Sequence, residues 1–246
     1  MHPFLEALGS STIVVVEPPG SGEGHWAGAP SALLHEGTWW LAYRLRRPVG
    51  RGYANVVGRS DDGVRFTTVA TITSSSMGAA TTVLPGSASE AWKDVVVRAG
   101  EQGWQMWACR HPLDLGDGEA DRMSTWYATS DDGLTWRLHG KALGPGEGWD
   151  RRGTRVTSVW DAADGTVQAL YDGRASAAEN FHERTGLATG APGSLTAREG
   201  PVPAAYGQAL RYASVVADGS GTRLYVERAR ADGAHELRTA YVSQPS

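Results

Sequence analysis

Charged side chains recur at the ends of four short strand-like segments in this sequence. Carboxylates and arginines that gather in one place can hold a polar ligand and exchange protons with it. The carboxylates best placed for acid–base chemistry are Asp94, Asp172 and Glu183. They predict a reaction that uses two carboxylates, such as hydrolysis of a glycosidic bond.

Arginine and aromatic side chains accompany these carboxylates. Arginine presents a planar fork that suits carboxylate, sulfate or phosphate groups, and aromatic rings supply flat apolar faces. Because the arginines outnumber the neighbouring carboxylates, the sequence predicts a net positive pocket and an anionic ligand. The predicted substrate-binding residues are Arg155, Arg211, Arg174, Arg110, His111, Trp26, Trp92, Tyr212, His25 and Glu179.

Two polar stretches keep alternative interpretations open. Glu179 and Glu183 stand four residues apart, so their stretch is either an exposed loop or helical turn, or a lid that supplies an acid. His25 comes just before the first repeated segment and is either a general base or a histidine on the rim of the pocket.

Metal and cofactor chemistry is not indicated. The seven histidines show no HxxxH or HxH spacing, and GSGEG at 20–24 does not lead into a helix pattern. The one cysteine, Cys109, lies in a predicted strand, where we expect it to be buried and inert. We therefore predict no metal and no cofactor.

The elements that must position these side chains form a repeat. Helical periodicity is nearly absent, and runs rich in Val, Trp, Tyr and Thr alternate with Gly/Asp turns, which is typical of all-β proteins. Four predicted hairpins line up, each with an aromatic-bearing second strand and a polar end. They span residues 29–47, 94–111, 155–174 and 211–230.

Each hairpin is followed by further strand-like sequence, but the last is followed by only one strand, ELRTAYVSQ. The strand STIVVVEP at 11–18 can complete that last group, which is how propellers close their ring. We therefore predict that residues 1–246 form a single β-propeller domain, with four blades by repeat count.

The segment TSDDGLTW at 129–136 resembles the Asp-box turn of sialidase-type propellers, and RSDDGVRF at 59–66 is a weaker copy. We expect Asp131 to accept backbone N–H groups, Gly133 to adopt positive φ and Trp136 to pack beneath the hairpin. These turns are interpreted as folding elements without a catalytic role. A sialidase itself is not expected, because 246 residues are too few for six blades.

The hairpins DVVVRAGEQGWQMWA and PSALLHEGTWWLAYR resemble those of five-bladed propeller glycosidases of the arabinanase, xylosidase and fructosidase type. The resemblance implies five blades, with an aspartate base or nucleophile in blade one, a second aspartate in blade two and a glutamate acid in blade three. Asp94 matches the blade-two position. The blade-one position falls on Ala29 and the blade-three position near Arg155, so two of the three depart from the pattern.

Two functions follow from this pattern. The first is a glycoside hydrolase-like enzyme that acts on a carbohydrate, with an anionic group expected, in a central pocket. The second is a non-catalytic glycan- or metabolite-binding propeller derived from such enzymes, which the missing carboxylates favour.

Composition narrows the possible partners. The net charge of −4 and a pI near 6.0 give no basic field for nucleic acid or an anionic membrane. No apolar run is long enough to span a membrane, and the first residues lack the pattern of a secretory signal. We expect a cytoplasmic protein with a small-molecule or oligosaccharide ligand, and the sequence does not predict an oligomeric state.

Overall fold

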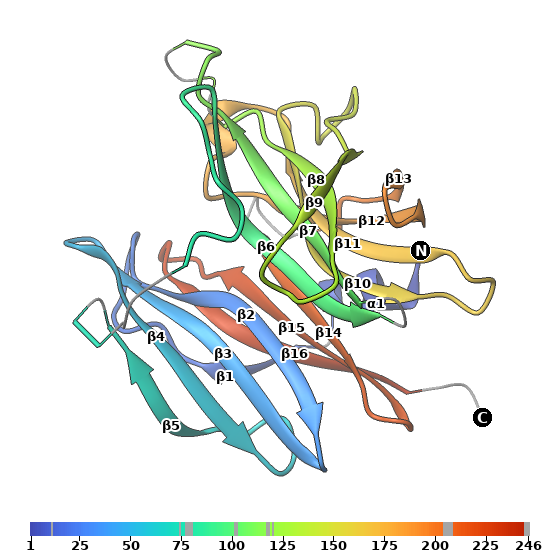
Figure 1. Cartoon of the computed structure of the whole chain (residues 1–246). Helices are drawn as coiled ribbons and strands as arrows, with labels where there is room; N and C mark the ends of the chain where they lie inside the picture. The colour runs from blue at the N-terminus through green and yellow to red at the C-terminus, as the bar shows by residue number, and fades with distance from the viewer. Residues whose placement is uncertain are drawn as a thin grey trace. The chain divides into compact units, whose positions relative to one another are not determined.

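The computed structural model describes residues 1–10, 12–73, 75–76, 81–100, 103–116, 119, 121–203 and 209–243. The described chain is almost entirely β-structure, as predicted (Figure 1). It divides into two compact units: unit 1 comprises Met1–Ala80 and Val202–Ser246, and unit 2 comprises Thr81–Pro201. That all 246 residues form one domain remains a prediction.

Unit 2 contains two antiparallel groups of four strands, and each group follows chain order. The 3₁₀ turn η1 (Ala177–Glu179) lies between the second and third strands of the later group. The first group is β6 (Glu90–Gly100), β7 (Gly103–Pro112), β8 (Ser124–Ser130) and β9 (Arg137–Leu143). The second group is β10 (Gly153–Asp161), β11 (Val167–Arg174), β12 (Arg184–Ala191) and β13 (Ser194–Glu199).

Unit 1 contains the other two groups. The first is β2 (Trp26–His35), β3 (Thr38–Arg47), β4 (Arg51–Ser60) and β5 (Thr67–Ile72). The second is β14 (Leu210–Ala217), β15 (Gly221–Ala229), β16 (His235–Ser243) and β1 (Ile13–Val16).

The N-terminal strand pairs where the sequence predicts. β1 pairs antiparallel with β16 and so becomes the outer strand of the last group. One parallel bridge, between Trp26 and His235, joins the two groups of unit 1. The pairing of β1 is confirmed, whereas closure of a ring and a count of four or five blades remain predictions.

Local sequence explains the hairpins. Glu36 and Gly37 both have positive φ, 49° and 75°, which is the backbone of a type I′ turn between β2 and β3. Beyond the turn, Trp39 and Leu41 are buried while Trp40 between them is partly exposed, which is the period of two of a half-buried strand. In unit 1 these side chains pack with Tyr225.

One helix, α1 (Pro3–Ser10), was not predicted from the sequence. Proline is tolerated in the first turn because that turn's N–H groups have no helical partner. Leu5 and Leu8 are fully buried on the inner side of α1, which packs mainly against β16. Two leucines on one short helix give too weak a periodicity to be recognised among strands.

Candidate active site

The centre of unit 2 is a buried ion pair between neighbouring strands. Arg155 on β10 and Asp172 on β11 are direct cross-strand partners, and each is 2% exposed. The Arg155 Nη2 atom lies 2.7 Å from Asp172 Oδ2, and the Thr185 hydroxyl donates to Asp172 Oδ1 at 3.2 Å. Asp172 therefore fixes the guanidinium of Arg155.

Asp94 is the most accessible carboxylate around Arg155. It lies on β6 at a register shift, with a φ of 48° that non-glycine residues rarely adopt. Its Oδ2 atom lies 3.4 Å from Arg155 Nη1 and 3.6 Å from Lys93 Nζ. The Asp94 side chain is 20% exposed, whereas that of Asp172 is 1% exposed. Strained backbone of this kind is frequent at functional sites.

Glu183 completes the cluster beside a second arginine. Its Oε1 atom lies 3.1 Å from Arg174 Nη1 and 4.0 Å from Arg155 Nη2, and Glu183 is 4% exposed. Arg174 also donates to Asn180 Oδ1 at 2.8 Å and pairs with Asp121 at 3.2 Å. The three predicted catalytic carboxylates thus lie around one guanidinium group, that of Arg155.

The interpretation of this stretch as an exposed loop is wrong for Glu183, because its side chain is buried and ion-paired. That Glu183 supplies an acid stays a prediction. Glu179, at the end of η1, accepts the Ala175 N–H at 3.0 Å and lies 3.6 Å from Arg184. It stabilises its own loop.

The charges of this cluster are nearly balanced. Arg110 pairs with Glu90 at 2.6 Å, and Arg174 pairs with two carboxylates. The prediction of a net positive pocket is therefore wrong for these arginines. It considered Asp94 and Asp172 as counter-charges and overlooked Glu90 and Asp121.

Lys93, missed in the sequence analysis, is the cation next to Asp94. Burial and the charge of Arg155 lower its pKa, although Asp94 opposes the shift. Burial and the charge of Lys93 also lower the pKa of His111 to about 4, which leaves His111 neutral at pH 7. Cys109 pairs with Lys93 across the strands, and burial raises the pKa of its thiol to about 12. Burial of Cys109 is confirmed.

Trp92 lies at the start of the same sheet. Its ring meets that of Trp126 edge to face at 5.9 Å between centroids, and the guanidinium of Arg110 lies 5.8 Å from the Trp126 ring. Trp92 is partly exposed and has no hydrogen-bond partner for its buried indole N–H among the described residues.

Unit 1 holds the other predicted binding residues. Arg211 on β14 and Glu227 on β15 are direct cross-strand partners, 2.7 Å apart. Glu227 Oε1 also contacts His235 Nδ1 at 2.6 Å, and Oε2 accepts the Ala29 N–H at 3.1 Å. Burial raises the pKa of Glu227, but Arg211 and His235 outweigh it and bring the value to about 2.

Trp26 does not offer a stacking face. It is 6% exposed and stacks on His235 at 4.6 Å, and the guanidinium groups of Arg46 and Arg211 lie 4.7 Å and 5.1 Å from its ring centroid. The prediction that Trp26 stacks on a sugar is therefore wrong, because both charged groups and an imidazole already cover the indole.

Tyr212 and His25 lie near this cluster. Tyr212 has a φ of 53° and the guanidinium of Arg211 lies 5.2 Å from its ring. His25 accepts the His235 N–H through its backbone oxygen at 3.0 Å, and its buried Nδ1 atom has no partner among the described residues. A general-base role for His25 stays a prediction.

A shared irregularity gives the true alignment of the four repeats. The first strand of each group carries one extra residue relative to its partner strand, at the point where the pairing register shifts; these strands are β2, β6, β10 and β14. The residue three positions before the first pair that follows the shift is equivalent in all four repeats. The four residues at this position are Gly28, Lys93, Arg155 and Arg211. The predicted alignment of Arg155 with Asp94 is therefore wrong by one residue. The counterparts of Asp94 are Ala29, Val156 and Tyr212.

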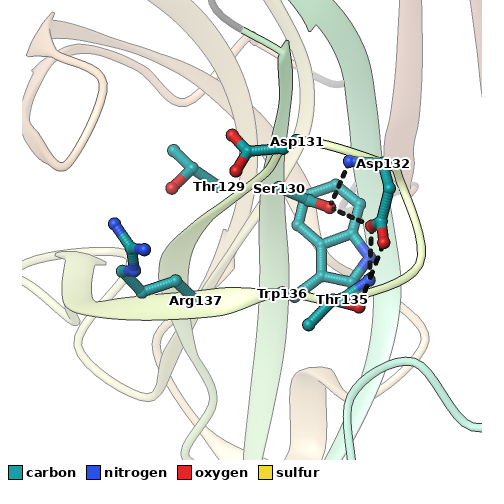
Figure 2. A pocket seen from close by; sticks show the side chains of 7 residues that line it. All are labelled: Thr129, Ser130, Asp131, Asp132, Thr135, Trp136 and Arg137. Atoms are coloured by element: carbon teal, nitrogen blue, oxygen red, sulfur yellow. Dashed lines mark hydrogen bonds between the residues drawn. The ribbon is translucent and has the colours of Figure 1, made fainter.

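The turn at 129–136, which the sequence predicts to be an Asp box, differs in one residue from the prediction. Asp132, not Asp131, accepts the N–H groups of Leu134 and Thr135 at 2.8 and 2.7 Å. Ser130 also donates to Asp132 at 3.0 Å (Figure 2). Asp62 does the same in the weaker copy. Gly133 has a φ of 74°, as predicted. The exposed side chain of Asp131 points away from this turn (Figure 2).

Two kinds of feature are absent from the residues that the structure describes. No three His, Cys, Asp or Glu side chains there are grouped to hold a metal ion. No helix within the same residues is long and apolar enough to cross a membrane.

Known proteins resemble this chain in structure but not in sequence. No family model and no curated protein matches it. A putative glycoside hydrolase from Parabacteroides distasonis matches with a TM-score of 0.55 and 13% identity, over 92% of this chain and 93% of that one. A glycosyl hydrolase from Bacteroides ovatus matches with a TM-score of 0.53 and 13% identity, over 96% and 92%.

A thermostable family-43 glycoside hydrolase matches with a TM-score of 0.51 and 12% identity, over 88% of this chain and 72% of that one. At such identities the likeness concerns the fold alone. The predicted resemblance to propeller glycosidases is thus confirmed at the level of the fold.

Proposed function

We propose that the chain is a glycoside hydrolase-like enzyme whose reaction takes place at the carboxylates around Arg155. The observation that carries this proposal is the convergence of Asp94, Asp172 and Glu183 on one guanidinium group. Because all three contact it, they lie within roughly 10 Å of one another, close to the spacing that glycosidases use. Similarity of fold to glycoside hydrolases supports the same class of reaction.

The three carboxylates have different roles in this proposal. Asp94 is the base or nucleophile, because its side chain is the most exposed of the three. Asp172 has the shortest contact with Arg155, 2.7 Å, and holds that guanidinium against Asp94. Glu183 is the proton donor, because it is the remaining carboxylate at the guanidinium of Arg155, which it approaches to 4.0 Å.

The second candidate is a glycan-binding protein without catalysis. Arg174 lies 3.1 Å from Glu183 and favours the charged form of that carboxylate, which opposes proton donation. A binder needs only hydrogen-bond donors, acceptors and stacking faces, and ion-paired carboxylates serve it well.

The proposed ligand of this site is a neutral sugar. The anionic sugar expected from the sequence would need unpaired cations, but the arginines of the cluster pair with carboxylates. Calorimetric titration with a uronic acid and its parent hexose distinguishes the two, and tighter binding of the uronic acid would restore the anionic ligand.

The test of catalysis is a panel of 4-nitrophenyl furanosides and pyranosides, with release of nitrophenolate as the readout. Wild-type protein should hydrolyse at least one, and Asp94→Asn should lose at least ~10²-fold of that rate. Asp131→Asn, at an exposed turn, is the matched control and should keep it. Oligosaccharide binding without any turnover would overturn the enzyme in favour of the binder.

A further inference from the structure

A hollow on the first sheet of unit 1 has no role in the proposed function. It encloses about 270 Å³ on the sheet β2–β5. Arg44 and Asn55, direct cross-strand partners on β3 and β4, supply its charged and amide groups. Ala29, Ser31, Ala42, Tyr43, Val57 and Ile72 line the rest.

Arg44 differs from the equivalent residues of the other repeats. In the two later repeats, the cross-strand pairs Arg155–Asp172 and Arg211–Glu227 place an acid opposite an arginine. In the first repeat the residue at the position of the acid is itself an arginine, Arg44 on β3.

Arg44 itself faces Gly28, which has no side chain. A Cβ atom at position 28 would overlap the carboxylate of Glu227, so that space is already occupied. Arg44 is half-buried and has no ion-pair or hydrogen-bond partner within the part of the chain that the structure describes.

The hollow combines a cation with apolar walls. A guanidinium group binds a carboxylate through two parallel N–H bonds, and the Asn55 amide adds a further donor beside it. Val57, Ala42 and Ile72 offer apolar surface on the same side of the sheet. We propose that this hollow binds a small organic carboxylate with an apolar body, through Arg44 and Asn55.

Calorimetric titration with benzoate and with benzamide, its neutral analogue, tests this binding. Benzoate should bind at least tenfold more tightly than benzamide, because one charge-assisted contact is lost. Arg44→Gln should abolish the difference. Arg59→Gln, an exposed arginine four residues along β4 from Asn55, is the matched control for charge and should leave it unchanged. Equal binding of the two probes, or unchanged benzoate binding by Arg44→Gln, would overturn the proposal.

Asn55→Asp tests the same idea without removing Arg44. The new carboxylate would lie directly across from Arg44 and take the place of the ligand, as Asp172 does for Arg155. Benzoate binding should fall at least tenfold while the melting temperature stays equal or rises. Retained benzoate affinity would contradict the proposal. Tighter binding of glucuronate than of benzoate by the wild-type protein would contradict the proposal that the ligand has an apolar body. These titrations need no enzymatic turnover, so they are independent of the glycosidase proposal. Arg44→Gln also separates a uronic acid bound in this hollow from one bound at the carboxylates around Arg155.

Discussion

Arg155–Asp172 in unit 2 and Arg211–Glu227 in unit 1 are the same cross-strand ion pair in two repeats, with different neighbours. In unit 1 the pair contacts His235, the Trp26 ring and the Ala29 N–H, and both of its members are 2% exposed. In unit 2 the pair extends to Asp94, whose side chain remains 20% exposed. The repeated pair therefore has a structural role in unit 1, whereas in unit 2 it supports an accessible carboxylate.

Among the changes that test this comparison, removal of residues 1–18 should cause the largest loss of stability. It deletes α1 and β1, exposes the edge of β16 and removes Leu5 and Leu8 from the core. Because loss of one buried leucine costs roughly 2–5 kcal/mol, we expect destabilisation of more than about 5 kcal/mol. Hydrogen exchange should show lost protection in β14–β16 before β6–β9. An unchanged melting temperature would contradict the role assigned to β1.

Glu227→Gln should destabilise the protein by about 3–5 kcal/mol, because removal of one partner leaves a buried guanidinium without its carboxylate. Urea unfolding measures this effect. Asp62→Asn, whose carboxylate is exposed on a turn, is the control with a much smaller expected loss. A loss of less than about 1 kcal/mol in the free energy of unfolding of Glu227→Gln would show that the unit 1 pair does not stabilise the fold.

The pH dependence of stability should show the contribution of Glu227. Glu227 has a pKa of about 2 in the folded protein against an ordinary value of 4.5, so the folded state favours the ionised form. The resulting stability, roughly 3 kcal/mol, is present above about pH 4.5 and is lost as the pH falls towards 2. Acid unfolding of wild type and Glu227→Gln measures it, and parallel curves would exclude Glu227 as the source.

The smallest effect is expected at the turn of residues 129–136. Asp132→Ala should lower the melting temperature by a few degrees, because two backbone N–H groups lose their acceptor. Asp131→Ala should leave it unchanged. The reverse order would restore the sequence-based assignment of Asp131.

Much of the fold was predictable because its signals are local. Alternation around Trp39 and Leu41 and the turn at Gly37 specify a hairpin without any long-range contact. The pairing of β1 followed from the missing strand of the last repeat. The helix α1 was missed because its two buried leucines carry too little periodic signal.

The candidate site was predictable in part. Asp94, Asp172 and Glu183 share one guanidinium, as repeat register suggested for the first two. The predicted alignment was off by one position because the equivalent positions of the four repeats share no residue type that marks them: they hold Gly28, Lys93, Arg155 and Arg211. Contacts such as Glu227–His235 and Arg174–Asp121 depend on how separate segments pack, which repeat counting does not reveal.

The most direct test of the central claim compares Asp94→Asn with Glu227→Gln in one set of preparations, by hydrolysis rate and melting temperature. Asp94→Asn should lose at least ~10²-fold of the rate and keep its melting temperature within a few degrees. Glu227→Gln should lose stability, with the folded fraction keeping its rate. Wild-type hydrolysis by Asp94→Asn would contradict the assignment of Asp94 as the reacting carboxylate.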